Sequence, residues 1–178
     1  MFKDHLSQNV TAPDFTEPIV GWRLWAVGYD KDDGLKPYLM SLWQSAPWPR
    51  GEPMVARCMQ VNTTHMHWMA KWKLPKLCCV HSPTERCKCG VYAYSDPGEV
   101  TVEPSRKVSL LVGRVALWGK TIRHERGYRA QYGYPVSIGL GESASLVCSS
   151  GWDRVEYLAN SYGVALDDAP PKQQRFDL

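Results

Sequence analysis

Residues 107–125, KVSLLVGRVALWGKTIRHE, carry the strongest secondary-structure signal in the chain. The stretch is rich in Val, Leu and Ile, which favour strands. Two glycines, Gly113 and Gly119, interrupt it, and a glycine inside a strand often marks a bulge or a close backbone approach. Strand alternation divides its centre into two faces: Val115, Leu117, Gly119 and Thr121 on one, and Ala116, Trp118, Lys120 and Ile122 on the other. The stretch therefore predicts a long, coiled strand of a small barrel or strongly bent sheet.

Shorter strand patterns and one helix complete an α+β, mainly β fold: a small strongly bent sheet or partly open barrel, with a zinc knuckle and a C-terminal helix. The further strands are expected within residues 21–30, 36–43, 54–61, 90–94 and 135–138, with turns near Gly127 and Gly133. In the first of them, Trp22, Leu24 and Ala26 alternate with Arg23, Trp25 and Val27, which predicts one buried face. The helix is expected within 149–164, capped by Ser149 or Ser150, facing the core with Val155, Leu158 and Ala159, and ending at Gly163.

The length and composition of the chain suit one globular domain. The chain has 178 residues, of which 44% are hydrophobic and 22% charged, close to ordinary globular values. We expect a loose N-terminal arm over residues 1–19 and a single zinc-bound β-rich domain over 20–166. Residues 62–77 have the character of an insertion, and 167–178 form a loose, polar tail.

Charge and hydropathy limit the partners and the compartment. A net charge of +3 permits contact with nucleic acid without requiring it. No run of about 18 apolar residues occurs, so we expect no membrane contact. The first twenty residues lack the apolar core of a signal peptide, which favours a cytoplasmic protein. Six cysteines in a reducing compartment indicate metal ligands or buried thiols rather than disulfides.

A histidine and two cysteines stand close together in residues 81–98, HSPTERCKCGVYAYSDPG. His81, Cys87 and Cys89 supply three of the four ligands that a structural zinc site needs, and Cys58 is the expected fourth. Four protein ligands leave no open position, which argues against a catalytic zinc. A turn with buried thiols and a redox pair are the alternatives. Other candidate ligands are Cys78 and Cys79 and, more weakly, His65 and His67.

A second cluster, in residues 121–135, TIRHERGYRAQYGYP, interleaves basic and aromatic side chains. Arginine can contact phosphate or stack on a base, and tyrosine offers a stacking face. The cluster could equally be a surface ion-pair network with half-buried tyrosines, or a protein-binding face. The candidate ligand-binding residues are Trp118, His124, Arg126, Tyr128, Arg129 and Tyr134.

The insertion 62–77 holds Trp68 and Trp72, which share one face if the segment is helical. Such a pair could anchor a protein partner, or it could fold back over the sheet. No nucleophile elbow, phosphate loop, dinucleotide fingerprint or paired-carboxylate motif occurs, which favours a binding protein over an enzyme.

Several motifs together resemble a family of small proteins from actinobacteria and their phages. They are Gly21 to Trp25, Cys58, His81 with Pro83, Cys87 to Ala93, Val112 to Ala130, Tyr134 with Pro135, and Leu158 to Val164. The insertion 62–77 departs from the family. The resemblance favours Cys58, His81, Cys87 and Cys89 as the metal ligands and implies no particular activity.

Two functions follow from these patterns. The first is a nucleic-acid or modified-base binding module with a structural zinc site, whose binding weakens with salt. The alternative is a phage-encoded interaction protein that binds and modulates a host protein through Trp68 and Trp72 of the insertion. That complex would tolerate salt.

Overall fold

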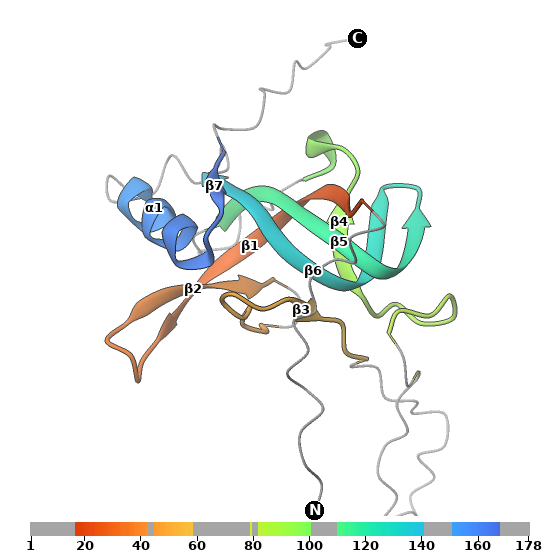
Figure 1. Ribbon diagram of the computed structural model, residues 1–178, viewed down its shortest axis with the longest axis horizontal. Helices are drawn as coiled ribbons and strands as arrows, with labels where there is room; N and C mark the ends of the chain where they lie inside the picture. The colour runs from red at the N-terminus through yellow and green to blue at the C-terminus, as the bar shows by residue number, and fades with distance from the viewer. Residues whose placement is uncertain are drawn as a thin grey trace, which may run out of the picture.

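The computed structural model describes residues 17–42, 45–58, 79, 82–100, 110–140 and 151–167. Strands predominate in these residues, and the one α-helix among them lies near the C-terminus (Figure 1). The strands are β1 (Ile19–Asp30), β2 (Lys36–Ser41), β3 (Met54–Val55), β4 (Val91–Tyr94), β5 (Leu110–His124), β6 (Gly127–Leu140) and β7 (Ala165–Leu166). A short 3-10 helix, η2 (Pro97–Glu99), follows β4, and the α-helix is α1 (Gly151–Tyr162). The expected mainly β fold with a C-terminal helix is confirmed.

Four strands close into a ring of hydrogen bonds within one strongly bent sheet. β1 pairs antiparallel with β5, β5 with β6, β6 with β4, and β4 with β1 through Trp22 and Tyr94. Three further strands add to the ring: β2 on β1, and β3 and β7 on β6, with β7 parallel. The four-residue β4 therefore completes the ring between two much longer strands.

The β5–β6 hairpin dominates the sheet, and glycine shapes it in three ways. The pairing shifts register between Trp118 and Thr121, where Gly119 has a φ of +74°, so the bulge expected at a strand glycine is confirmed there. A Cβ on Gly113 would lie 2.0 Å from the carbonyl oxygen of Ser137, so the backbones approach closely at that position. The turn expected near Gly133 is wrong, because β6 runs through it unbroken. A Cβ at Gly133 would lie 2.8 Å from Val91 Cγ1, so this glycine makes room for β4.

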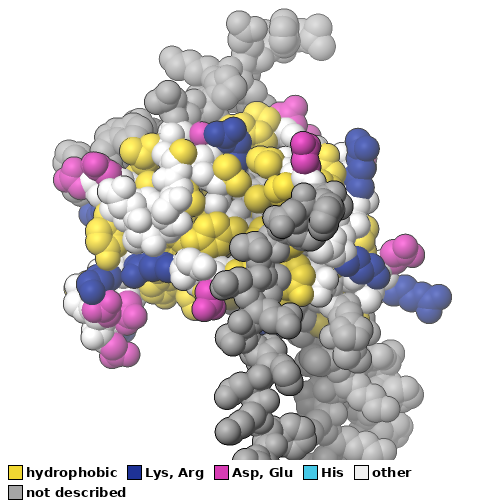
Figure 2. Space-filling view, in the orientation of Figure 1, with side chains coloured by type: hydrophobic (Ala, Val, Ile, Leu, Met, Phe, Trp, Pro, Cys, Tyr) yellow, Lys and Arg dark blue, Asp and Glu magenta, His cyan; other side chains and the backbone are white. Residues whose placement is uncertain are grey.

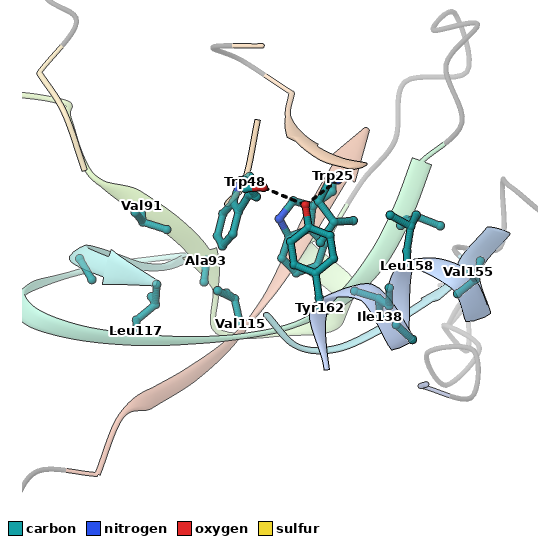
Figure 3. Close-up of a cluster of buried hydrophobic side chains, with 14 residues drawn as sticks. Trp25, Trp48, Val91, Ala93, Val115, Leu117, Ile138, Val155, Leu158 and Tyr162 are labelled. Atoms are coloured by element: carbon teal, nitrogen blue, oxygen red, sulfur yellow. Dashed lines mark hydrogen bonds between the residues drawn. The ribbon is translucent and has the colours of Figure 1, made fainter. Parts of the chain in front are cut away.

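The main core lies between the inner face of the sheet and α1 (Figure 3). The helix buries the face expected from the sequence, namely Val155, Leu158 and Ala159. Tyr162, at its last turn, donates a hydrogen bond to the carbonyl oxygen of Trp48 (2.8 Å) and accepts one from the amide of Leu39 (3.1 Å). Trp48 in turn packs edge-on against the fully buried Trp25, with ring centroids 5.5 Å apart. The helix ends as expected at Gly163, whose φ is +64°.

A second, smaller cluster lies on the other face of β1 and β5. Its buried members are Leu24, Ala26, Leu110 and Val112. Since Trp25 is buried on the opposite face, β1 is buried on both sides at its centre, and the single buried face expected from its alternation is wrong.

The two ends of the sheet differ. α1 and β7 lie at one end, which we call the helix end, and β4 with the loop of residues 82–90 lies toward the other, which we call the knuckle end (Figure 1). No helix among the described residues is long and apolar enough to cross a membrane. The expected arm 1–19 and tail 167–178 lie almost entirely outside the described residues, as does the insertion 62–77.

Candidate metal centre and adjoining cavity

Four cysteines meet at the knuckle end. Cys58 follows β3, Cys79 stands alone among the described residues of its segment, and Cys87 and Cys89 precede β4. Their four sulfur atoms all lie within 4.8 Å of one another. The Sγ atoms of Cys58 and Cys87 are 3.6 Å apart, and those of Cys79 and Cys89 are 3.2 Å apart.

This arrangement fits a tetrahedral metal site. With zinc–sulfur bonds of about 2.3 Å, neighbouring sulfurs of a tetrahedral site lie about 3.8 Å apart, close to the separations seen here. Four thiolates favour zinc among common divalent ions, since hard cations prefer oxygen. Three of the cysteines are buried and Cys79 is half-buried, so the cluster can exclude water. Burial, with hydrogen bonds that its thiol donates to the sulfurs of Cys89 and Cys58, raises the pKa of Cys79 to about 11, so metal binding there would release a proton.

Three of the four expected ligands lie in this cluster. Cys58, Cys87 and Cys89 come together, and Cys79, which the sequence offered as a competing ligand, lies with them. His81 lies outside the described residues, as do the other competitors Cys78, His65 and His67. The geometry therefore supplies a complete four-cysteine site without the histidine.

Arg129 of β6 connects the β5–β6 hairpin by hydrogen bonds to the loop of residues 82–90, which we call the knuckle. Only 3% of this residue is exposed. Its Nη1 donates hydrogen bonds to the carbonyl oxygens of Cys87 and Cys89, the second at 3.2 Å, and its Nε donates to Nε2 of His124 at 2.6 Å. Gly90, directly after the cysteines, has a φ of +140°, and a Cβ there would lie 2.9 Å from Cβ of Arg129. The glycine after the Cys-x-Cys motif thus lets the chain turn beside the arginine.

The six residues proposed from the sequence as a ligand site occupy different environments. Trp118 is buried and stacks on Tyr132, with centroids 6.1 Å apart. Tyr134 donates a hydrogen bond to the carbonyl oxygen of Tyr162 (2.8 Å), at the helix end. The other four line one cavity at the knuckle end: His124, Arg126, Tyr128 and Arg129. Trp68 and Trp72, the proposed partner anchors, lie outside the described residues, so their role stays a prediction.

This cavity, which we call the knuckle cavity, has a volume of about 1410 Å³ and lies between β1, β4, residues 52–57 and the knuckle. Its lining is strongly basic. The cationic side chains are Arg23, Arg57, Arg86, Lys88, Arg126 and Arg129, against the carboxylates Glu52 and Glu85. Three tyrosines also line it: Tyr92, Tyr94 and Tyr128. On the face shown in Figure 2, basic and acidic side chains are interspersed around the described surface.

Arg23 is one of the lining residues that were not predicted from the sequence. Its alternation with buried neighbours placed it on the face of β1 opposite Trp22 and Leu24, together with Trp25. Its guanidinium lies 4.9 Å from the ring centroid of Trp48. Burial lowers the pKa of this guanidinium to about 10, although Tyr94 opposes the shift, so the group stays cationic at neutral pH. A polar residue in a strand pattern normally indicates a solvated face, which is why this position gave no signal.

No protein-family model, no curated protein and no solved structure matches the chain. The resemblance to the actinobacterial and phage family therefore stays a prediction.

Proposed function

We propose that the protein is a nucleic-acid-binding module in which a structural zinc ion holds the knuckle and a single-stranded segment or extruded base lies in the knuckle cavity. The observation that carries this proposal is the composition of the cavity wall: six cationic side chains and three tyrosines against two carboxylates. Cations neutralise backbone phosphates, and tyrosine rings stack on bases without regard to sequence.

Four of the cations lie at the surface, where they can contact a polyanion. Arg57, Arg86, Lys88 and Arg126 are exposed, and Tyr92 is 43% exposed beside them. Arg126 also pairs with Glu99 and lies over the ring of Tyr94, at 5.8 Å from its centroid. An arginine stacked on a tyrosine offers a flat, cationic platform of the kind that unstacked bases use.

The cysteines would hold zinc, and the zinc would act only as a cross-link. It would join the chain after β3 to the loop before β4, so its binding energy would stabilise the fold directly. With four sulfur ligands the ion has no open position, so it would neither bind nor activate a ligand itself.

The test is binding of fluorescent oligonucleotides as a function of salt. Labelled oligo(dT), oligo(rU) and a DNA duplex are titrated with purified, nuclease-treated protein, and anisotropy is measured from low to physiological salt. We expect the single strands to bind more tightly than the duplex, with an affinity that falls as salt rises.

A matched pair of double variants makes the test specific. Arg86→Gln with Lys88→Gln removes two cavity cations, and Lys31→Gln with Lys120→Gln removes two exposed cations that do not line the cavity. Each phosphate contact with a single strand contributes about −0.7 to the slope of log K, the binding constant, against log salt. Loss of two such contacts in the first variant should therefore make this negative slope shallower by about 1.4. Equal slopes in both variants, or no oligonucleotide binding by the wild type, would refute the proposal.

A further inference from the structure

The guanidinium of Arg23 lies at the inner wall of the knuckle cavity, and among the described residues its contacts are with neutral groups. Its Nη1 donates a hydrogen bond to the carbonyl oxygen of Tyr92, and its Nη2 donates one to Oγ of Ser41 at 3.3 Å. The ring of Trp48 covers one side. Its Nε is buried and has no hydrogen-bond partner, and no described carboxylate forms an ion pair with this arginine.

A buried cation without a counter-ion is unfavourable, and so is a buried N–H without an acceptor. Proteins usually pair such a charge or leave it at a place where a ligand completes it. Arg23 lines the cavity, so an incoming anion could reach it. The guanidinium carries five N–H donors in a fixed fork, and the contacts to Tyr92 and Ser41 use two of them.

We propose that Arg23 is an anion-binding residue that accepts a phosphate group of a ligand entering the knuckle cavity. A tetrahedral phosphate matches the planar fork of arginine and would supply both the missing counter-ion and an acceptor for the free donors. The cavity is far larger than a single ion, so the phosphate belongs to a larger molecule. The choice of a phosphorylated ligand rests on the proposed function; the anion site itself does not.

The neighbours of Arg23 fix its guanidinium before any ligand arrives. Oγ of Ser41 also accepts a hydrogen bond from Nε1 of Trp48 at 2.9 Å, so the hydroxyl that orients the arginine is itself held by the core. Tyr92, whose carbonyl oxygen accepts from Nη1, exposes its ring at the cavity wall. A phosphate at Arg23 would therefore sit next to an aromatic surface on which an attached base could stack.

The experiment is calorimetric titration with inorganic phosphate at constant ionic strength, followed by titration with oligo(dT) with and without a 5′-phosphate. Arg23→Gln keeps a donor and removes the charge, Arg23→Lys keeps the charge and removes the fork, and Lys120→Gln is the exposed control outside the cavity. We expect Arg23→Gln to weaken phosphate binding at least tenfold, Arg23→Lys to weaken it less, and Lys120→Gln to change it less than twofold.

The two proposals fail in different ways. If phosphate binds through Arg23 and no oligonucleotide binds, the anion site stands and the proposed function falls. If oligonucleotides bind the wild type and Arg23→Gln equally well, the proposed function stands and this inference is wrong. A gain that depends on the 5′-phosphate and on Arg23 identifies a terminal phosphate as the ligand group; an equal loss for both oligonucleotides identifies a backbone phosphate.

A measurement on the unmutated protein covers the case in which Arg23 variants do not fold. The arginine Nε–H resonances are followed by nitrogen–proton NMR during a phosphate titration. One Nε–H signal, slow to exchange with water because it is buried, should shift with saturation at the calorimetric affinity. If no arginine signal shifts, Arg23 is not the site.

Discussion

The helix end and the knuckle end of the sheet are stabilised by different forces. At the helix end, α1 buries a continuous apolar face, and the polar groups there, such as the hydroxyl of Tyr162, form neutral hydrogen bonds inside the core. At the knuckle end, four cysteine sulfurs, one of them on the half-buried Cys79, and the guanidinium groups of Arg23 and Arg129 lie near the buried apolar residues Val91 and Ala93 of β4.

The difference shows how one small sheet can combine a densely packed apolar core at the helix end with an open, charged cavity at the knuckle end. A cavity of about 1410 Å³ is incompatible with dense apolar packing in the same place. A metal ion bound by the four cysteines would fix the backbone there without filling the space around it. The knuckle end can therefore expose a basic wall while the helix end supplies the hydrophobic stability.

The largest effect should come from breaking the cysteine cluster. Cys87→Ser removes one of four ligands, and we expect the protein to lose its zinc and about 5 kcal/mol or more of stability. For a chain of this size that corresponds to a fall in Tm of about 10–20 °C. Metal content by mass spectrometry and thermal unfolding check this. Chelation of the wild type should reproduce the loss, and a wild-type Tm that ignores the chelator would contradict the prediction.

The second largest loss of stability is expected from a substitution at the helix end. Leu158 is fully buried, so Leu158→Ala should lower the free energy of unfolding by about 3 kcal/mol. Because the loss is at the opposite end of the sheet, it should be the same with and without chelator. Urea denaturation of both forms measures this, with Glu156→Ala, an exposed position on the same helix, as the control. A loss that depends on zinc would mean that the two ends are coupled.

A smaller effect on zinc affinity is expected at Arg129, which bonds to the backbone of two of the four cysteines. Arg129→Gln removes donors to the carbonyl oxygens of Cys87 and Cys89 and should weaken zinc affinity about 10–100-fold. Competition with a coloured chelator measures the affinity. Arg126→Gln, three residues away and bonded to Glu99 instead, should leave it unchanged. Equal zinc affinities in the two variants would show that Arg129 does not position the knuckle.

The smallest loss of stability is expected from removal of the hydroxyl group of Tyr162. Tyr162→Phe leaves the ring in place and removes the hydroxyl that bonds Trp48 and Leu39, which should cost about 1–2 kcal/mol. Zinc affinity should not change. Denaturation and chelator competition together test this, and a change in zinc affinity would contradict the separation of the two ends.

Much of the fold could be predicted from the sequence, because its main signals are local. The long strand over β5, its bulge at Gly119 and the buried face of α1 follow from side-chain periodicity and glycine chemistry. The continuity of β6 could not be predicted. From the sequence, Gly133 predicts a turn. In the structure a glycine is needed there because β4 packs against it, and the sequence gives no sign of this long-range contact.

In the candidate site too, the features with a local sequence signal could be predicted, and those that depend on long-range contacts could not. The Cys-x-Cys motif predicted a metal knuckle, and Cys58, the fourth ligand favoured from the sequence, lies beside Cys87 and Cys89. No spacing rule distinguished Cys79 from Cys78. The bonds of Arg129 to backbone carbonyls and the burial of Arg23 have no sequence signature, because both depend on which strands the ring places side by side.

The closed ring also limits how this protein can meet another chain. A free strand edge presents unpaired backbone groups to which a foreign strand can add. Among the described residues, the strands that pair on one side only are β2, β3 and β7, and the last two have two residues each. β2 begins with Lys36 and Pro37, and its outer edge bonds to residues 46–48. The edges of β2, β3 and β7 therefore offer little room for an added strand.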